Sequence, residues 1–275
     1  MNTYSLRALA TSLLQNVRLK FIYIALIIGL INVIPGLLPG TSQYMILSVV
    51  IAVLLCASHH GYVTASLKIL TGHKNDVSEV EDGFVFIRRF FDLFPTYFLA
   101  LIASYLPFLI AGVAFFLFNK SGVTLLISFI KNPQSSVLSK SADLTDILLL
   151  VWGVAVVCYI FKIYIDLKLK MTGYFLEFKG YKGFKALKAS WKMMKGKIGL
   201  LIRLYLSFAL TYVVSLFISS MAYSFFNNEV GLIFSVIIMA LCEAYFIEPL
   251  LEMSIGVMFM QSLQVTITPN ENSGM

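Results

Sequence analysis

Long apolar stretches alternate with short polar segments along the whole chain. Each stretch approaches or exceeds the roughly 20 residues of helix that cross a hydrocarbon core about 30 Å thick. Because backbone groups in lipid must be hydrogen-bonded within the protein, we expect these stretches to be helices. Six transmembrane helices are therefore predicted, at residues 21–38, 44–70, 96–117, 148–165, 198–223 and 232–263.

Composition narrows the class to an all-α integral membrane protein. Of the 275 residues, 59% are hydrophobic and 13% are charged, and the mean hydropathy is +0.86. These values are far from those of a soluble domain. We expect a single transmembrane domain, a helical bundle over residues 1–263, followed by a short polar cytoplasmic tail at 264–275.

The distribution of lysine and arginine predicts how the helices are threaded. Of the 21 lysines and arginines, three (Lys120, Lys131 and Lys140) lie in the loop between the third and fourth spans. The others lie before the first span, or in and near the connections between the second and third spans and between the fourth and fifth spans. By the positive-inside rule, that loop lies outside and both termini lie in the cytoplasm, which places the protein in the cell membrane. The outer segment 119–146 contains an apolar run at 123–130 that is too short to span. This run either dips into the membrane or lies on it.

A lysine-rich stretch precedes the fifth span. Its lysines recur every three or four residues, as on one helix face, while Phe184, Leu187, Trp191 and Met194 take the opposing face. We expect this face to contact the anionic lipids of the inner leaflet, so the net charge of +7 is not a nucleic-acid signal. A cytosolic partner or an acidic substrate is the alternative. The lysines expected at the headgroups are Lys182, Lys185, Lys188, Lys192 and Lys195.

A short amphipathic helix is predicted before the first, third and fifth spans. In each, apolar residues follow the spacing i, i+3, i+7, and two spans come after it. These segments predict three units of interfacial helix plus transmembrane hairpin, over residues 1–72, 78–168 and 180–263. The alternative is that any amphipathic helix shows this spacing. The residues concerned are Leu6, Leu9 and Leu13, then Phe84, Ile87 and Phe91, then Phe184, Leu187 and Trp191.

Charged residues inside the spans are candidates for function, because each costs at least about 2.5 kcal/mol to insert. We expect a polar cluster of Lys162, Arg203, Glu243 and Glu248, in which Arg203 pairs with Glu248. Glu243 lies roughly 16 Å from the outer start of its span, so a local hydrogen bond is expected there. The cluster either ties spans together or marks a translocation path; snorkelling to the interface is the third interpretation.

Two further features are candidates for irregular or reactive positions. Pro249 cannot donate a backbone hydrogen bond, so a kink is expected beside Glu248, either merely packed or lining a site. His59 and His60 are adjacent and point about 100° apart on a helix, so they do not form an i, i+4 metal pair. No sequence signature of a nucleotide, metal or acyl-transfer site is present. We therefore expect no cofactor, no metal and no enzymatic activity.

A run near the fifth span carries a family resemblance. Ser190-Trp191-Lys192-Met193-Met194-Lys195-Gly196, continuing to Leu204-Tyr205-Leu206-Ser207-Phe208, resembles the S-x-x-L-M-K-G … L-x-L-S-F signature of the domain of unknown function nine-seven-five family of Firmicutes membrane proteins. Pro249 followed by Phe259 is similar to that family's closing pattern. The tryptophan that commonly follows the L-S-F segment is absent from 209–213. The resemblance implies a bacterial multi-pass membrane protein, and the family offers no catalytic residues to carry over.

Two functions are compatible with these patterns. The first is a non-enzymatic membrane module for envelope maintenance, partner assembly or protection against membrane-active peptides, with a membrane-protein partner or a second copy of the chain. The alternative is a transporter or permease for a small solute or peptide. A polar cavity that reaches Glu243 would favour transport, whereas an apolar core around a locally hydrogen-bonded Glu243 would favour the module.

Overall fold

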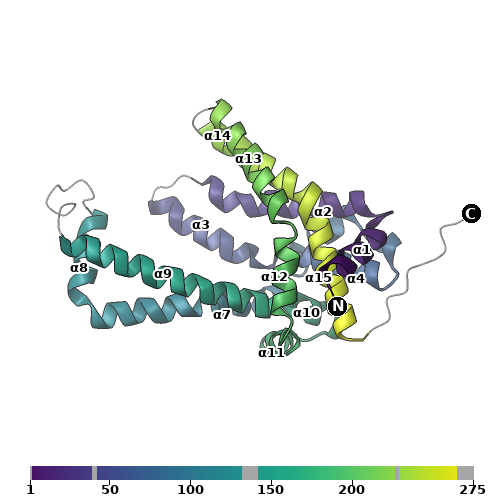
Figure 1. Ribbon diagram of the computed structural model, residues 1–275, viewed down its shortest axis with the longest axis horizontal. Coiled ribbons are helices and arrows are strands. Elements are labelled where there is room, and N and C mark those ends of the chain that lie inside the picture. The colour runs from purple at the N-terminus through teal and green to yellow at the C-terminus, as the bar shows by residue number, and fades with distance from the viewer. Residues whose placement is uncertain (1, 39–41, 132–141, 227–228, 265–275) are drawn as a thin grey trace, which may run out of the picture. The chain divides into compact units, whose positions relative to one another are not determined.

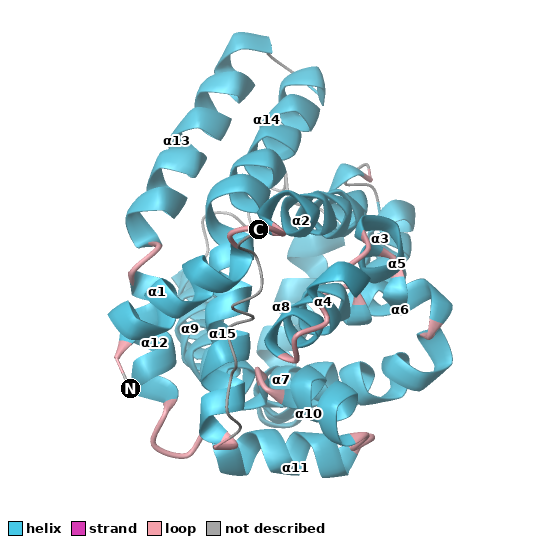
Figure 2. Cartoon of the chain, turned by 90° about the vertical axis from the view of Figure 1, so that its right-hand side faces the viewer, coloured by secondary structure: helices cyan, strands magenta, loops and turns pink. Residues whose placement is uncertain are grey.

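The computed structural model describes residues 2–38, 42–131, 142–226 and 229–264. Every regular element in these residues is a helix, and none is a strand (Figure 2). The all-α class is thus confirmed. The α-helices are α1 (Thr3–Leu14), α2 (Arg18–Val33), α3 (Ser42–Leu54), α4 (His60–Leu70), α5 (Glu79–Gly83), α6 (Val85–Arg88), α7 (Phe90–Phe118), α8 (Lys120–Lys131), α9 (Ala142–Leu169), α10 (Thr172–Lys179), α11 (Phe184–Met193), α12 (Ile198–Leu206), α13 (Ala209–Phe226), α14 (Glu229–Cys242) and α15 (Glu248–Ser262). The shorter helical turns are η1 (Ile34–Leu37), η2 (Leu55–Ala57), η3 (Lys74–Asp76) and the π-helical η4 (Glu243–Ile247).

Helix length and hydropathy bear out the multi-pass prediction. Five segments are long and apolar enough to cross a membrane, and α12 with α13 makes a sixth if this pair, bent by 44°, counts as one span. The five are Arg18–Leu37, Tyr44–Leu70, Phe90–Phe118, Thr145–Lys179 and Val230–Ser262. Several spans therefore depart from one straight helix. The fifth bends between α12 and α13, η2 interrupts the second before α4, the fourth is broken between α9 and α10, and η4 interrupts the last.

Contacts divide the chain into two compact units. The first comprises residues 1–99 and 169–275, and the second comprises residues 100–168. The second unit ends at residue 168, as the predicted second hairpin unit does, but it begins at 100 rather than 78. The single domain and its three hairpin units stay predictions. The predicted tail at 264–275 lies outside the described residues except for Gln264.

The core of the first unit surrounds α15. All ten residues from 251 to 260 are buried, although this helix contains Glu252 and Ser254. Helix α1 packs on α15 through its apolar side, and α4 and α2 pack on it as well. The rings of Tyr174 and Phe259 stack at 5.1 Å between α10 and α15. Because it is covered on all sides, α15 is the central element of this unit, whereas α13 and α14 extend side by side as a hairpin (Figure 1).

The second unit contains the rest of α7, together with α8 and α9. The thiol of Cys158 on α9 contacts the backbone carbonyl of Pro107 on α7 at 3.5 Å. The side chains of the α7 and α9 spans are mostly exposed, and they are apolar, as expected for surfaces that face lipid. The run at 123–130 forms most of α8, whose 12 residues rise only about 18 Å and do not cross a bilayer.

Gly61 permits a close approach at the start of α4. A Cβ atom at this position would lie 2.5 Å from the backbone oxygen of Asp82 and 2.9 Å from Cδ1 of Ile28. Gly61→Ala should therefore destabilise the first unit by about 1–3 kcal/mol, as overpacking of a close contact does. Gly199→Ala on α12 is the matched control, because nothing lies within 4 Å of its Cβ position. Thermal unfolding of the detergent-purified protein measures both, and equal melting temperatures would contradict this contact.

Candidate functional site

A π-turn interrupts the last span just before Pro249. The backbone N–H of Glu248 donates to the carbonyl of Glu243, five residues earlier, and Ile247 has φ −115° and ψ −63°. Pro249 has no N–H to continue an α-helical ladder, so the irregularity expected at this proline is confirmed. Such one-turn π-bulges concentrate at functional sites.

The π-turn changes which side chains share a face. In a regular α-helix, two residues five positions apart point about 140° away from each other. The five-residue hydrogen bond instead stacks Glu248 over Glu243, so both carboxylates project to one side of the helix. An α-helical projection of the sequence does not reveal this pairing. The two acidic side chains therefore point into the same space beside the helix.

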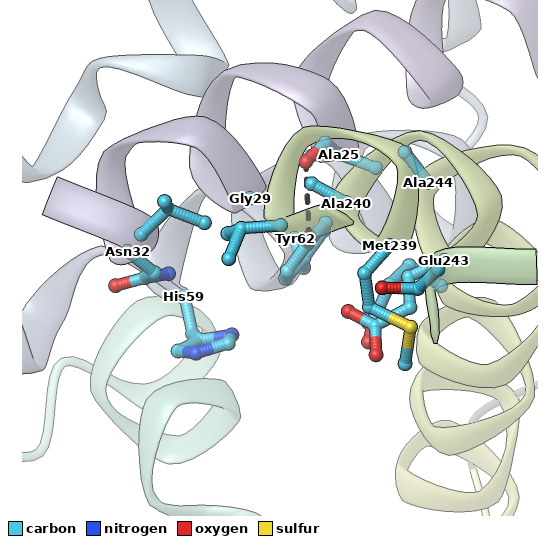
Figure 3. A pocket seen from close by; sticks show the side chains of 13 residues that line it. Ala25, Gly29, Asn32, His59, Tyr62, Met239, Ala240, Glu243 and Ala244 are labelled. Carbon is cyan, nitrogen blue, oxygen red and sulfur yellow. Dashed lines mark hydrogen bonds between the residues drawn. The ribbon is translucent and has the colours of Figure 1, made fainter. Parts of the chain in front are cut away.

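That space is a cavity of about 310 Å³ within the first unit. Figure 3 shows Asn32 and His59 on one side of it and Met239 and Glu243 on the other. Gly29 on α2 lies close to Ala240 on α14, where a Cβ would meet the alanine methyl at 3.6 Å, so small residues bring these helices together. The polar lining consists of Asn32, His59, Tyr62, Ser219, Glu243 and Glu248, and the rest is Ala25, Gly29, Val33, Val236, Met239, Ala240 and Ala244.

The two carboxylates of the cavity have no cationic partner of their own. In the described part of the chain, neither Glu243 nor Glu248 has a side-chain hydrogen bond or an ion pair. Lys170 acts electrostatically on Glu248, but its ammonium group is already paired with Glu252. The hydrogen bond expected for Glu243 is thus not made there. Among the described residues, no three acidic, histidine or cysteine side chains are placed to hold a metal ion.

A buried ion pair lies one helical turn beyond the cavity. The ammonium of Lys170 donates to the Glu252 carboxylate at 2.7 Å, and the Glu252 side chain is only 6% exposed. The hydroxyl of Tyr174 donates to the backbone oxygen of Glu252 at 3.1 Å. Gly256 follows on α15, where a Cβ would lie 3.3 Å from the same hydroxyl. These contacts tie the end of the fourth span to the central helix.

A second polar network forms where the second span is broken. The ring of His60 is fully buried; its Nδ1 lies 2.9 Å from the Tyr97 hydroxyl and its Nε2 lies 3.0 Å from Glu177. Arg89 donates to both carboxylate oxygens of Glu177, at 3.0 and 2.8 Å. Gly173 lies against the Tyr97 hydroxyl, with no room for a Cβ. The network joins α4, α7 and α10 with the residue that precedes α7.

The break places the two adjacent histidines in different surroundings. His59 immediately precedes α4 and lines the cavity, whereas His60 opens α4 and belongs to the buried network. Just before them, the Ser58 hydroxyl donates to the Asn32 side chain at 2.8 Å. The sequence signal for this arrangement is the polar run Ser58-His59-His60-Gly61 inside an apolar span.

The structure separates the members of the predicted polar cluster. Glu243 and Glu248 line one cavity. Arg203 on α12 is exposed and forms no ion pair with Glu248 in the described residues. Lys162 lies in the second unit, where its ammonium pairs with Asp166 at 2.6 Å. Two carboxylates of the four predicted residues are thus brought together, and no cation joins them.

Helix α11 presents lysines and aromatic rings on the same exposed side. Phe184 is 74% exposed and Trp191 is 44% exposed, while Leu187 and Met194 are buried. The prediction that all four apolar residues lie on the face opposite the lysines is therefore wrong for Phe184 and Trp191. Lys182 pairs with Asp92 at 2.7 Å, and the ammonium of Lys185 lies over the Tyr181 ring. The predicted headgroup lysines are all exposed: Lys182, Lys185, Lys188, Lys192 and Lys195.

Comparison with known proteins adds no identity. No family model, no curated protein and no solved structure matches the chain. The resemblance to the domain of unknown function nine-seven-five family therefore stays a prediction from its motifs.

Removing one partner of the Lys170–Glu252 pair should destabilise the first unit. Lys170→Met or Glu252→Gln leaves a charge or polar group unpaired in a low-dielectric environment and should cost about 3 kcal/mol each. The double variant should be more stable than either single one, because no charge remains. Lys182→Met, at the exposed pair with Asp92, is the control and should change little. Additive losses in the double variant, measured by thermal unfolding, would show that the two groups do not interact.

Proposed function

We propose that this chain is a non-enzymatic, multi-pass membrane protein that binds a small positively charged solute in the cavity and carries it across the membrane. The observation that supports this function is the π-turn, which aims Glu243 and Glu248 into one space without a cation of the protein between them. A cavity that reaches Glu243 is the feature expected of a transporter, and within the described residues Glu243 has no side-chain hydrogen bond.

The chemistry of the cavity favours an organic cation of modest size. A carboxylate near the middle of a bilayer costs several kcal/mol unless a counter-charge accompanies it. The cavity of about 310 Å³ is at the lower end of the range for small-molecule sites. The rings of His59 and Tyr62 offer faces to an ammonium or guanidinium group. A small ammonium or guanidinium compound therefore fits both the charge and the volume.

The orientation that we propose has both termini in the cytoplasm of a cell membrane. It rests on the cation-rich connections, including α11, and it gives the three pairs of spans the same direction. In each pair a short helix comes first: α1 before α2, α5 and α6 before α7, and α11 before α12. We propose these as three related units, which α11 anchors at the anionic lipids of the inner leaflet.

A second candidate function is the membrane module for envelope maintenance, partner assembly or protection against membrane-active peptides. The exposed lysines and rings of α11 favour it, because this surface suits an anionic membrane or membrane-protein partner, or a second copy of the chain. No nucleic-acid partner is proposed. If a deletion strain became sensitive to membrane-active peptides and the purified protein took up no organic cation, this function would be favoured over transport.

Substitution of the cavity carboxylates should abolish uptake. We expect proteoliposomes containing the protein to accumulate labelled methylammonium, tetramethylammonium or guanidinium, and Glu243→Gln or Glu248→Gln to reduce this uptake to the level of protein-free liposomes. The reason is that each amide keeps the shape of the side chain but removes the charge that binds the cation.

Glu81→Gln is the matched control, because this carboxylate is 58% exposed and lies away from the cavity. It should transport at the unsubstituted rate, and all variants must retain their melting temperature. Uptake that survives both cavity substitutions would remove the two glutamates from the mechanism, and no uptake of any of the three cations by the unsubstituted protein would contradict transport of this class.

The position of α11 can be measured with the two tryptophans of the chain. Trp152→Phe leaves Trp191, which should be quenched most by lipids brominated near the headgroup, because α11 lies at the interface. Trp191→Phe leaves Trp152 in the fourth span, which should respond to deeper bromines. Lys188→Cys should react with an impermeant maleimide in inside-out vesicles and not in intact cells. Labelling from the outside would reverse the proposed orientation.

A further inference from the structure

Helix α1 has two faces with different roles. Its apolar face, formed by Leu6, Ala10, Leu13 and Leu14, is buried, and the helix packs on α15. The opposite face borders two pockets of about 600 and 450 Å³. The two pockets share Ala8, Thr11 and Leu250, so they form one continuous depression along α1. We call this depression the α1 groove; it does not include any residue of the cavity.

An arginine without an acidic partner lies at each end of the α1 groove. A guanidinium N–H of Arg7 donates to the backbone oxygen of Ser207 at 3.3 Å, and the group lies 4.6 Å from the centre of the Phe208 ring. Arg18 lies 5.7 Å from the centre of the Tyr245 ring. In the described residues neither arginine pairs with a carboxylate, and no acidic residue lines either pocket. Several guanidinium donors therefore remain available to an anion.

The rest of the groove combines a polar wall with an apolar floor. The hydroxyls of Thr11 and Ser12 donate to carbonyls of their own helix, so they offer acceptors rather than donors. The amide of Gln15 adds a donor next to Arg18. Phe246, which is 55% exposed, supplies apolar surface at the base of the groove. An anionic head matches the guanidinium and amide donors, hydroxyl groups on such a head match the acceptors of Thr11 and Ser12, and a hydrocarbon chain matches the apolar floor.

The location of the groove points to the same class of ligand. Arg18 is the first residue of the first span, and Leu250 belongs to the last span. The arginine thus stands where the hydrocarbon of a bilayer meets the headgroups, and basic pockets at this level bind phospholipid heads. We infer that the α1 groove binds one molecule of an anionic glycerophospholipid, with the phosphate at Arg18, the head extending along the groove toward Arg7, and an acyl chain against Phe246. This site is separate from the transport cavity and does not depend on transport.

Native mass spectrometry of the delipidated protein tests the site. Phosphatidylglycerol should bind at low molar excess, whereas phosphatidylcholine, which has no net charge, and glycerol 3-phosphate, which lacks the chains, should bind weakly. Arg18→Gln should weaken phosphatidylglycerol binding about tenfold, as loss of a charge-assisted hydrogen bond does, and Arg18→Lys should retain part of it. Arg7→Gln should have a similar effect, provided that its melting temperature shows a folded protein.

Arg88→Gln is the matched control, because it removes the same guanidinium charge from a position that is 58% exposed and lies outside the groove. It should leave phosphatidylglycerol binding unchanged. An equal loss in this variant would mean that the lipid follows general surface charge and would overturn a defined groove. If glycerol 3-phosphate bound as tightly as the lipid, the ligand of the groove would be a free phosphate ester and not a phospholipid. No effect of Arg18→Gln would remove the groove as a site.

Discussion

The need to hydrogen-bond every backbone group away from water governs this structure. Regular helices satisfy it along most of the apolar segments, and departures from them are tolerated only where protein or a cavity surrounds the backbone. Three such departures in the first unit are the turn at Ser58 and His59, the bend between α12 and α13, and η4. Two of these three border the cavity. The irregular backbone and the polar side chains of the first unit are therefore parts of one arrangement.

Partly buried ion pairs give this arrangement its register. Lys170 with Glu252, and Arg89 with Glu177, join segments that are 82 and 88 residues apart in the chain. A slip of either helix by one turn would leave both charges unpaired, and unpaired charges are costly in a low-dielectric environment. Van der Waals packing of apolar side chains alone would discriminate less between such registers. The tight glycines at 61, 173 and 256 add steric limits at the same junctions.

The sequence predicted most of the spans because length and hydropathy are properties of one segment at a time. It did not reveal the network of His60 and Glu177, since these residues lie 117 positions apart and only packing brings them together. Helical angles also do not reveal that Glu243 and Glu248 share one side, because they assume 3.6 residues per turn through a segment that is π-helical. Likewise, the spacing of apolar residues placed Phe184 and Trp191 opposite the lysines, but burial of Ala186 and Ser190 leaves both rings exposed.

The adjacency of His59 and His60 has a mechanical consequence. One backbone turn carries an imidazole that borders the cavity and another that is hydrogen-bonded to Tyr97 and Glu177. Consecutive residues share a peptide plane, so a backbone movement that withdraws the first ring also moves the second. A shift of the backbone at His59 would thus strain the hydrogen bonds of His60 to Tyr97 and Glu177, so the buried network holds the cavity-lining turn in place.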